Sequence, residues 1–163
     1  MKLYFDIDTQ IDFMFPAGAL YVPGAEKLLP RIAQLNRDAV MHGGKLISTA
    51  CAHDEDDPEF KQWPPHCVKG TVGQTRPAAL LVGNGQIILE KQQLNLFTNP
   101  NADALIRALD PDECIVYGVV TEYCVKECAV GLRERGYKVS ILRDAIQSLN
   151  PAEADSFLRD FGG

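Results

Sequence analysis

Cys124 lies where a helix is expected to begin, directly after a buried strand. The apolar segment 113–118 indicates the strand, and the segment 125–135 has apolar residues at helical spacing. A cysteine at such a helix start feels the positive end of the helix dipole, which lowers the pKa of its thiol and favours the nucleophilic thiolate. Backbone N–H groups at the same place can hold an oxyanion. Cys124 therefore predicts nucleophilic catalysis, with a buried, inert cysteine as the alternative.

Two residues at the ends of other predicted strands have the chemistry that a cysteine nucleophile requires. Asp8 ends the strand 3–8, and Lys91 directly follows the strand 86–90. An aspartate can accept the thiol proton, and a lysine ammonium favours the thiolate. Together with Cys124, these residues predict amide hydrolysis through a thioester, in which Asp8 also protonates the leaving nitrogen. Taken singly, Asp8 would be better explained as a turn acid and Lys91 as a solvated strand end.

The elements that must position these residues alternate between strand and helix. We expect strands over 3–8, 45–50, 86–90, 113–118 and 138–142, and helices over 25–42, 99–109, 124–135 and 150–162. This order predicts one α/β domain over 1–163, a three-layer α/β/α, doubly wound, Rossmann-like fold. Its mostly parallel sheet has five strands, and a sixth strand, or a partner subunit that covers the sheet edge, is left open. The carboxyl ends of the strands would form the active-site edge.

Composition excludes several classes of partner. The chain has 163 residues and a net charge of -6, with no cluster of basic residues, so we expect neither nucleic acid nor a membrane as a partner. The first residues run straight into a strand, which is typical of neither a signal peptide nor a transmembrane helix. The five cysteines show no framework spacing, which favours free thiols and a cytoplasmic location.

Four segments together resemble the isochorismatase-like cysteine hydrolases. The segment 8–13 is similar to their D-x-Q-x-D-F opening, and Lys91 with Phe97 is similar to their K-x(5)-F segment. The segment 118–125 resembles their G-x-x-T-x-x-C-V nucleophile turn. The segment 63–67, W-P-P-H-C, resembles the nicotinamidases of that superfamily most closely. The similarity spans residues 3 to about 145, nearly the whole chain.

This resemblance implies a catalytic triad and a site for a planar amide. The triad would be Asp8, Lys91 and Cys124, and the oxyanion hole would come from the N–H groups of Val120 and Cys124 beside a cis peptide between Val119 and Val120. The residues expected to contact the substrate are Phe13, Trp63, Phe97 and Tyr123. The implied activity is hydrolysis of a small carboxamide, with conversion of nicotinamide to nicotinate and ammonia favoured.

The resemblance also implies a divalent metal, although the ligand pattern departs from that of the family. Nicotinamidases hold their metal with the pattern D-x-H, a middle histidine and W-P-P-H. Here His53 and His66 match, Cys51 occupies the aspartate position, and Glu59 falls near the middle histidine. The expected ligands are therefore Cys51, His53, Glu59 and His66, with zinc favoured. Loss of the metal site is the alternative.

Other functions stay open from the sequence alone. The chain could cleave a carbamoyl or ureido compound, or it could be a non-catalytic descendant that binds a ligand or a metal. A thiol-redox protein using Cys124 and Cys128 ranks low, because C-x-x-x-C is not the C-x-x-C redox motif. Among partners we expect a small-molecule amide substrate and a second copy of the chain in a homo-oligomer.

Overall fold

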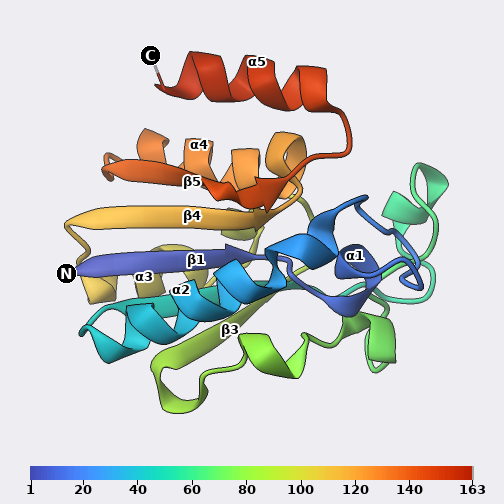
Figure 1. The fold of residues 1–163 in the computed structure, drawn as a ribbon, viewed down its shortest axis with the longest axis horizontal. Coiled ribbons are helices and arrows are strands. Elements are labelled where there is room, and N and C mark those ends of the chain that lie inside the picture. The colour runs from blue at the N-terminus through green and yellow to red at the C-terminus, as the bar shows by residue number, and fades with distance from the viewer. Residues whose placement is uncertain (163) are drawn as a thin grey trace.

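The computed structural model describes residues 1–162 and contains a five-stranded parallel sheet with helices on both faces (Figure 1). The strands are β1 (Lys2–Ile7), β2 (Lys45–Cys51), β3 (Gln86–Lys91), β4 (Glu113–Val119) and β5 (Val139–Gln147). Their order in the sheet is β3-β2-β1-β4-β5. All the strands are parallel, but the order in which they are added reverses on the two sides of β1. The crevice at such a switch point is where open α/β sheets bind ligands. The predicted α/β class is confirmed, and residues 1–162 supply no sixth strand.

The helices largely follow the predicted order. They are α1 (Ile11–Met14), α2 (Leu29–Met41), α3 (Ala102–Leu109), α4 (Lys126–Glu134) and α5 (Pro151–Gly162). In Figure 1, α2 lies in front of the sheet and α3 lies behind it, whereas α5 lies beyond the β5 edge. A π-helical turn over Thr121–Val125 precedes α4, so Cys124 lies inside this turn and not at the first residue of an α-helix. No helix in residues 1–162 combines the length and the apolar character that crossing a membrane requires.

β5 continues to Gln147, beyond the predicted strand 138–142. The prediction stopped at the polar pair Arg143–Asp144, which is exposed in the structure. Because β5 is an outer strand, polar side chains can face solvent there without ending the ladder. The register shifts between Val116 and Gly118, and the ladder then resumes with Gly118 beside Ile146. The extra length carries the chain toward the active-site edge before α5 begins.

The central strand β1 is covered on both faces. Leu3, Phe5 and Ile7 are buried on one face, and Asp6 is buried on the other. Asp6 accepts hydrogen bonds from Thr9 Oγ1 at 2.7 Å and from Asn36 Nδ2 at 2.9 Å, so its charge has partners.

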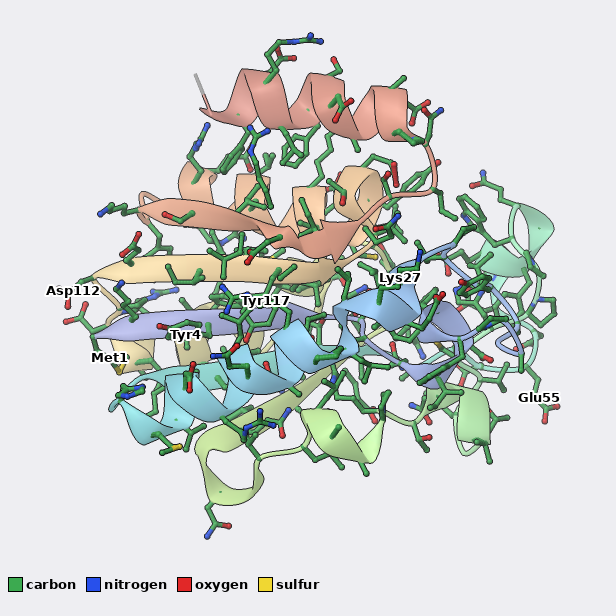
Figure 2. The ribbon with its side chains drawn as sticks, in the orientation of Figure 1. Met1, Tyr4, Lys27, Glu55, Asp112 and Tyr117 are labelled. Carbon is green, nitrogen blue, oxygen red and sulfur yellow. The ribbon has the colours of Figure 1, made fainter. Side chains whose placement is uncertain are left out.

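A buried hydrogen bond joins the sheet to α2 on the face that this helix covers. Tyr117 of β4 donates its hydroxyl hydrogen bond to Asn36 Oδ1 of α2 at 2.7 Å. Figure 2 shows Tyr117 close to Tyr4 of the neighbouring strand β1. These contacts fix α2 on the sheet. They thereby also fix the end of the segment 15–28, which precedes α2.

Two features of the sheet place the active-site edge. The register aligns Ile7 with Thr49 and Gly118, and Cys51 with Lys91, so four strands end within two residues of the same level. Gly118 has a φ of 115°, and a Cβ at this position would collide with the Ile7 carbonyl oxygen. Only glycine allows β1 and β4 to approach so closely. The residues that follow these strands are therefore brought together at one edge.

Candidate active site

Asp8, Lys91 and Cys124 meet at the carboxyl edge of the sheet, where the sequence placed them. Asp8 directly follows β1, Lys91 ends β3, and Cys124 lies in the turn after β4. Lys91 Nζ lies 2.8 Å from Asp8 Oδ2 and 3.4 Å from Cys124 Sγ. All three side chains are buried. A carboxylate and a thiol thus share one ammonium group, which is the arrangement that a cysteine nucleophile with a neighbouring base requires.

The position of the Asp8 carboxylate depends on the backbone conformation of Asp8 and on hydrogen bonds to Thr49 of β2. Asp8 has a φ of 50°, in the left-handed region that aspartate tolerates better than most residues. The Thr49 hydroxyl donates to Asp8 Oδ1 at 2.6 Å and accepts from the Asp8 N–H at 3.1 Å. The second oxygen of the carboxylate is thereby left for Lys91 and the thiols.

Cys51 lies beside these three residues and is not part of the group formed by His53, Glu59 and His66. Its Sγ lies 3.4 Å from both Asp8 Oδ2 and Lys91 Nζ. Gln10 accepts from the Cys51 N–H at 2.8 Å and donates to the Cys51 carbonyl at 2.8 Å. Cys51 is still part of β2, in register with Lys91, and this directs its thiol toward the ammonium. The expected four-ligand set therefore loses Cys51.

The charges of the site favour a neutral thiol at rest. Burial opposes ionisation of Asp8, but Lys91 and the hydrogen bonds from Cys124 and Thr49 outweigh it and hold the pKa of Asp8 below its usual value. Burial also opposes the charge of Lys91, yet Asp8 keeps the pKa of Lys91 well above its usual value. The pKa of Cys124 lies well above its usual value because of its contact with Cys51, its burial and the Asp8 carboxylate. The expectation of a resting thiolate is therefore wrong, since these effects exceed the opposing influence of Lys91.

The turn between β4 and Cys124 has the backbone features implied by the resemblance. The peptide between Val119 and Val120 is cis. The Val120 carbonyl accepts the N–H groups of Tyr123 and Val125, each at 3.1 Å, and this closes the turn around Cys124. The first N–H groups of a helical segment lack partners within the helix. The N–H groups of Val120 and Cys124 remain the predicted oxyanion donors.

A small apolar pocket opens onto Cys124 and Asp8. Its free volume is about 30 Å³, and its walls include Phe13, Trp63 and Tyr123, as expected. The Trp63 and Tyr123 rings meet edge to face, with centroids 5.4 Å apart. Three further wall residues, Leu20, Leu94 and Leu149, were missed, because a leucine in a loop carries no motif signal.

Phe97, which was expected to contact the substrate, does not line this pocket. The Arg135 guanidinium carbon lies 3.6 Å from the centroid of the Phe97 ring. A Cβ at Gly131 of α4 would come within 2.7 Å of the same ring. The absence of a side chain at Gly131 therefore lets Phe97 pack on α4, and its role in the structure is to support that helix.

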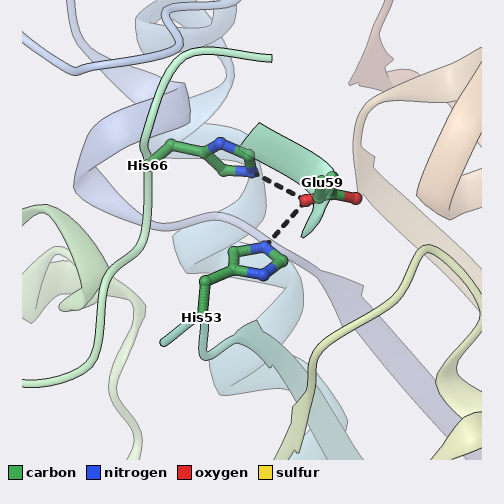
Figure 3. Close-up of side chains that lie close together, drawn as sticks. All are labelled: His53, Glu59 and His66. Carbon is green, nitrogen blue, oxygen red and sulfur yellow. Dashed lines mark ion pairs between the residues drawn. The ribbon is translucent and has the colours of Figure 1, made fainter. Parts of the chain in front are cut away.

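His53, Glu59 and His66 form a cluster beside the pocket (Figure 3). Glu59 Oε2 lies 2.9 Å from His53 Nε2 and 3.3 Å from His66 Nε2. The other ring nitrogens are held from outside, His53 Nδ1 by Asp57 Oδ2 and His66 Nδ1 by the Pro64 carbonyl, each at 2.8 Å. A histidine that donates from Nδ1 in this way keeps Nε2 free to bind a metal. Both Nε2 atoms face the same carboxylate oxygen.

The donor atoms of this cluster fit a divalent metal ion. Two imidazole lone pairs and a carboxylate oxygen in contact would repel one another unless a cation or protons lay between them. His53 Nε2 is buried, and although Glu59 Oε2 lies 2.9 Å away, this nitrogen makes no hydrogen bond of good geometry within the part of the chain that the structure describes. Nitrogen and carboxylate donors are a good set for zinc, and three protein ligands leave a position open.

In the absence of a metal, protons would balance the charge of this cluster. Burial opposes ionisation of Glu59, but the neighbouring imidazoles of His53 and His66 lower its pKa to about 2. Burial likewise opposes the charge on His53, but Glu59 and Asp57 outweigh it and raise the pKa of His53. Binding of a metal must therefore compete with protons at His53.

Comparison with known proteins agrees with this geometry. The isochorismatase domain model matches residues 4–161. The chain belongs to the isochorismatase family. This confirms the resemblance that the motifs around Asp8, Lys91 and Cys124 predicted.

Family members with printed activities cover most of the chain. It is 31% identical to the nicotinamidase of Escherichia coli, over 92% of this chain and 84% of that protein. It superposes on the crystal structure of a pyrazinamidase of Pyrococcus horikoshii in complex with zinc, with a TM-score of 0.92 and 26% identity over 99% and 94% of the two chains. An N-carbamoylsarcosine amidase from Thermoplasma acidophilum superposes with a TM-score of 0.88 and 25% identity over 99% and 92%. The isochorismatase family therefore includes amidases of more than one kind.

Proposed function

We propose that this chain is a cysteine amidohydrolase that cleaves a small carboxamide, with nicotinamide as the favoured substrate. The observation that carries the proposal is the ammonium of Lys91, which contacts both the Asp8 carboxylate and the Cys124 thiol at the base of an apolar pocket. The nicotinamidase and pyrazinamidase among its relatives support this choice of substrate.

Acylation begins from a carboxylate, an ammonium and a thiol. Asp8 accepts the Cys124 proton while the sulfur attacks the amide carbon, so a C–S bond forms and the carbonyl oxygen becomes an oxyanion. The N–H groups of Val120 and Cys124 are the proposed donors to that oxyanion. Asp8 then returns its proton to the amide nitrogen, the C–N bond breaks and ammonia leaves. Because the pKa of the Cys124 thiol lies well above its usual value, its proton moves to Asp8 as the sulfur attacks.

Deacylation repeats the same proton movements with water. A water molecule attacks the thioester carbon and gives its proton to Asp8, and the same N–H groups hold the second oxyanion. The C–S bond then breaks, Asp8 returns the proton to the sulfur, and the carboxylic acid product leaves. Lys91 stays an ammonium throughout, since its pKa is raised well above the usual value by its buried anionic neighbours. Its role is to balance whichever of Asp8 and Cys124 carries the negative charge.

His53, Glu59 and His66 are the residues that would hold a metal, and zinc suits their donor atoms best. When bound, the metal would supply a Lewis acid that binds the ring nitrogen of a pyridine amide and orients it. Glu59 and His66 line the same pocket as Cys124, which supports this role. The nucleophile remains the Cys124 sulfur, so the metal is proposed to orient the substrate and not to activate water.

An amide of the carbamoyl kind is the second candidate, and the related N-carbamoylsarcosine amidase supports it. That substrate carries a carboxylate. The charged residues that line the pocket are Asp8 and Glu59, with neither lysine nor arginine among the lining residues that the structure describes. An anionic substrate would therefore depend on the metal alone for charge balance, whereas a neutral aromatic amide would pack against Phe13 and Trp63.

Ammonia release from a panel of amides tests the proposal. The zinc-loaded protein would be assayed with nicotinamide, pyrazinamide and N-carbamoylsarcosine, with Cys124→Ala as the matched control. We expect release from the two ring amides that disappears in the control. Release from N-carbamoylsarcosine alone would favour the second candidate. A folded, zinc-loaded protein that releases ammonia from none of them would refute an amidohydrolase.

A further inference from the structure

Glu122 connects the nucleophile turn to the segment that follows β5. Glu122 lies two residues before Cys124 and its side chain is buried. Its Oε1 accepts the N–H of Leu149 at 2.9 Å, and its Oε2 accepts the N–H of Asn150 at 3.0 Å. A carboxylate that binds two adjacent N–H groups fixes that backbone in position and orientation, because charged acceptors form the stronger hydrogen bonds. The turn that carries the nucleophile therefore also holds residues 149 and 150.

Leu149 is thereby fixed as a wall of the pocket. Its side chain lines the pocket together with Cys124 and Leu20. Asn150 is anchored at the start of α5, where its Oδ1 accepts the Glu153 N–H at 3.3 Å. On the other side, Gln147 donates from Nε2 to the Pro23 carbonyl at 3.0 Å, which ties the end of β5 to the loop after Leu20. Leu149 thus lies between two anchored points and cannot move aside freely.

We infer that Leu149 determines substrate size in the proposed reaction and that Glu122 is a positioning residue that holds Leu149 against the pocket. The inference rests on the proposed amidohydrolase function. The pocket is small and its walls are mostly apolar, so a wall that is held in place decides which acyl groups enter. Leu149 accordingly selects unsubstituted, flat amides over those with an additional ring substituent.

Leu149→Ala tests the first half of this inference. The comparison is between nicotinamide and nicotinamides that carry one ring methyl group, measured as kcat/KM. One methylene in an apolar pocket is worth roughly 10–200-fold, so the preference for at least one methylated amide should rise about tenfold or more relative to nicotinamide. Leu149→Met, which conserves volume, should keep the original preference. Leu81→Ala, the same change at an exposed leucine, should also keep it.

Glu122→Gln tests the second half, because the amide keeps the size of the carboxylate but has one acceptor atom instead of two. The preference should shift in the same direction as in Leu149→Ala, with a higher KM for nicotinamide and a smaller change in kcat. A glutamate that merely stabilised the turn would behave differently. Its loss would lower kcat for all amides alike and leave their ratio unchanged, which would overturn the role assigned to Glu122.

Binding provides a readout that does not need turnover. Trp63 is the single tryptophan of the chain and lines the pocket, so its fluorescence reports the dissociation constant of each amide directly. If the protein binds amides without releasing ammonia, the proposed function fails, while the change in binding preference still decides the role of Leu149. Equal preferences in wild type and Leu149→Ala, by turnover or by fluorescence, would overturn the inference. Binding of none of the amides to the wild-type protein would overturn both proposals.

Discussion

The triad of Asp8, Lys91 and Cys124 and the cluster of His53, Glu59 and His66 border one pocket but are placed by different means. The three triad residues lie at or just after the ends of strands, so the register of the sheet fixes their spacing. The cluster lies in the long segment after β2, which has short 3₁₀ turns and one isolated bridge, between His53 and Val68. The register of the sheet therefore positions the nucleophile, whereas one isolated bridge and several side-chain contacts position the cluster.

The Asp12 side chain of α1 binds the loop that carries the cluster. Its Oδ2 accepts the N–H of Cys67 at 2.8 Å, directly after His66, and its Oδ1 accepts the N–H of Ala19 at 2.9 Å. A Cβ at Gly73 would collide with this carboxylate, so the loop closes tightly around it. The buried Asp12 carboxylate thus helps to fix the position of the loop, as the sheet register fixes the positions of the triad residues. The two regions should respond differently to substitution.

Cys124→Ala is expected to produce the largest difference between its effect on the triad and its effect on the cluster. Loss of the nucleophile should lower kcat by roughly 10⁴-fold or more, as removal of a nucleophile does in other triads. Zinc affinity and thermal stability should stay near their wild-type values, because Cys124 contacts none of the three cluster residues. Ammonia release, zinc titration and a thermal melt of the same sample measure all three. Residual turnover close to that of wild type would exclude the thioester mechanism.

Lys91→Met should affect stability more than any change in the cluster. It leaves the Asp8 carboxylate buried without its ammonium, which costs about 3–5 kcal/mol when one partner of a buried pair is removed. Asp8→Asn with Lys91→Met should recover part of that loss, so a double-mutant cycle by urea unfolding measures the coupling. Additive losses in the cycle would show that the two charges do not stabilise each other.

The same ion pair predicts how wild-type stability depends on pH. The folded-state pKa of Asp8 is lowered, so its contribution is present above the usual value of 3.8 and is lost as pH falls through the folded value. The folded-state pKa of Lys91 is raised, so its contribution is present below 10.5 and is lost as pH rises through the folded value. The alkaline loss should be absent in Lys91→Met. Unfolding free energies measured across pH would show whether it is.

Glu59→Gln should weaken metal binding without changing the triad. The substitution removes the anionic donor, so zinc affinity should fall by more than the roughly 10–100-fold typical of lost supporting contacts. Asp57→Asn, which only weakens the support of His53, should stay within that range. Because the pKa of His53 is raised above 6.5, protons should compete and zinc affinity should fall as pH drops through the raised value. Calorimetric titrations at several pH values provide the comparison.

Asp12→Asn is the mildest test, and it should separate the loop from the sheet. One of the two N–H groups that Asp12 binds would lose its acceptor, at a cost of about 1–3 kcal/mol. Zinc affinity should drop because the residue next to His66 is released, while the rate of Cys124 alkylation by iodoacetamide should not change. A matched change in the alkylation rate would mean that the loop and the triad are positioned together.

The sequence predicted the triad better than the cluster for a physical reason. Asp8, Lys91 and Cys124 follow apolar runs that indicate strands, and parallel strands end at a common edge. Cys51 was assigned to the metal by its place in a motif, but the direction of its side chain depends on its register with Lys91. That register is a long-range property that a local pattern does not contain. The pKa of Cys124 was predicted in the wrong direction for the same reason, since its neighbours come from distant segments.

Some of the residues that line the pocket could be predicted from local motifs, and others could not. Phe13 and Trp63 lie in recognisable motifs and were expected in the pocket wall. Leu149 was not expected there. It reaches the pocket because β5 extends to Gln147 and because Glu122 holds the segment that follows β5. Phe97 satisfied its motif but packs on α4. Local sequence patterns identify the residues that take part in chemistry, while the walls that select a substrate depend on how elements end and how they are tied together.

The central place of β1 has a consequence for synthesis on the ribosome. Leu3 pairs with Lys45 on one side but with Cys114 on the other, so one edge of this central strand gains its partner only after the segment up to Cys114 has been made. At roughly 5–20 residues per second, that edge stays unpaired for on the order of 5–20 s, a period in which nascent strands are prone to misassociate. The nucleophile emerges later still, directly after the strand that closes the gap. Each nascent chain therefore lacks its nucleophile until β4 has been made.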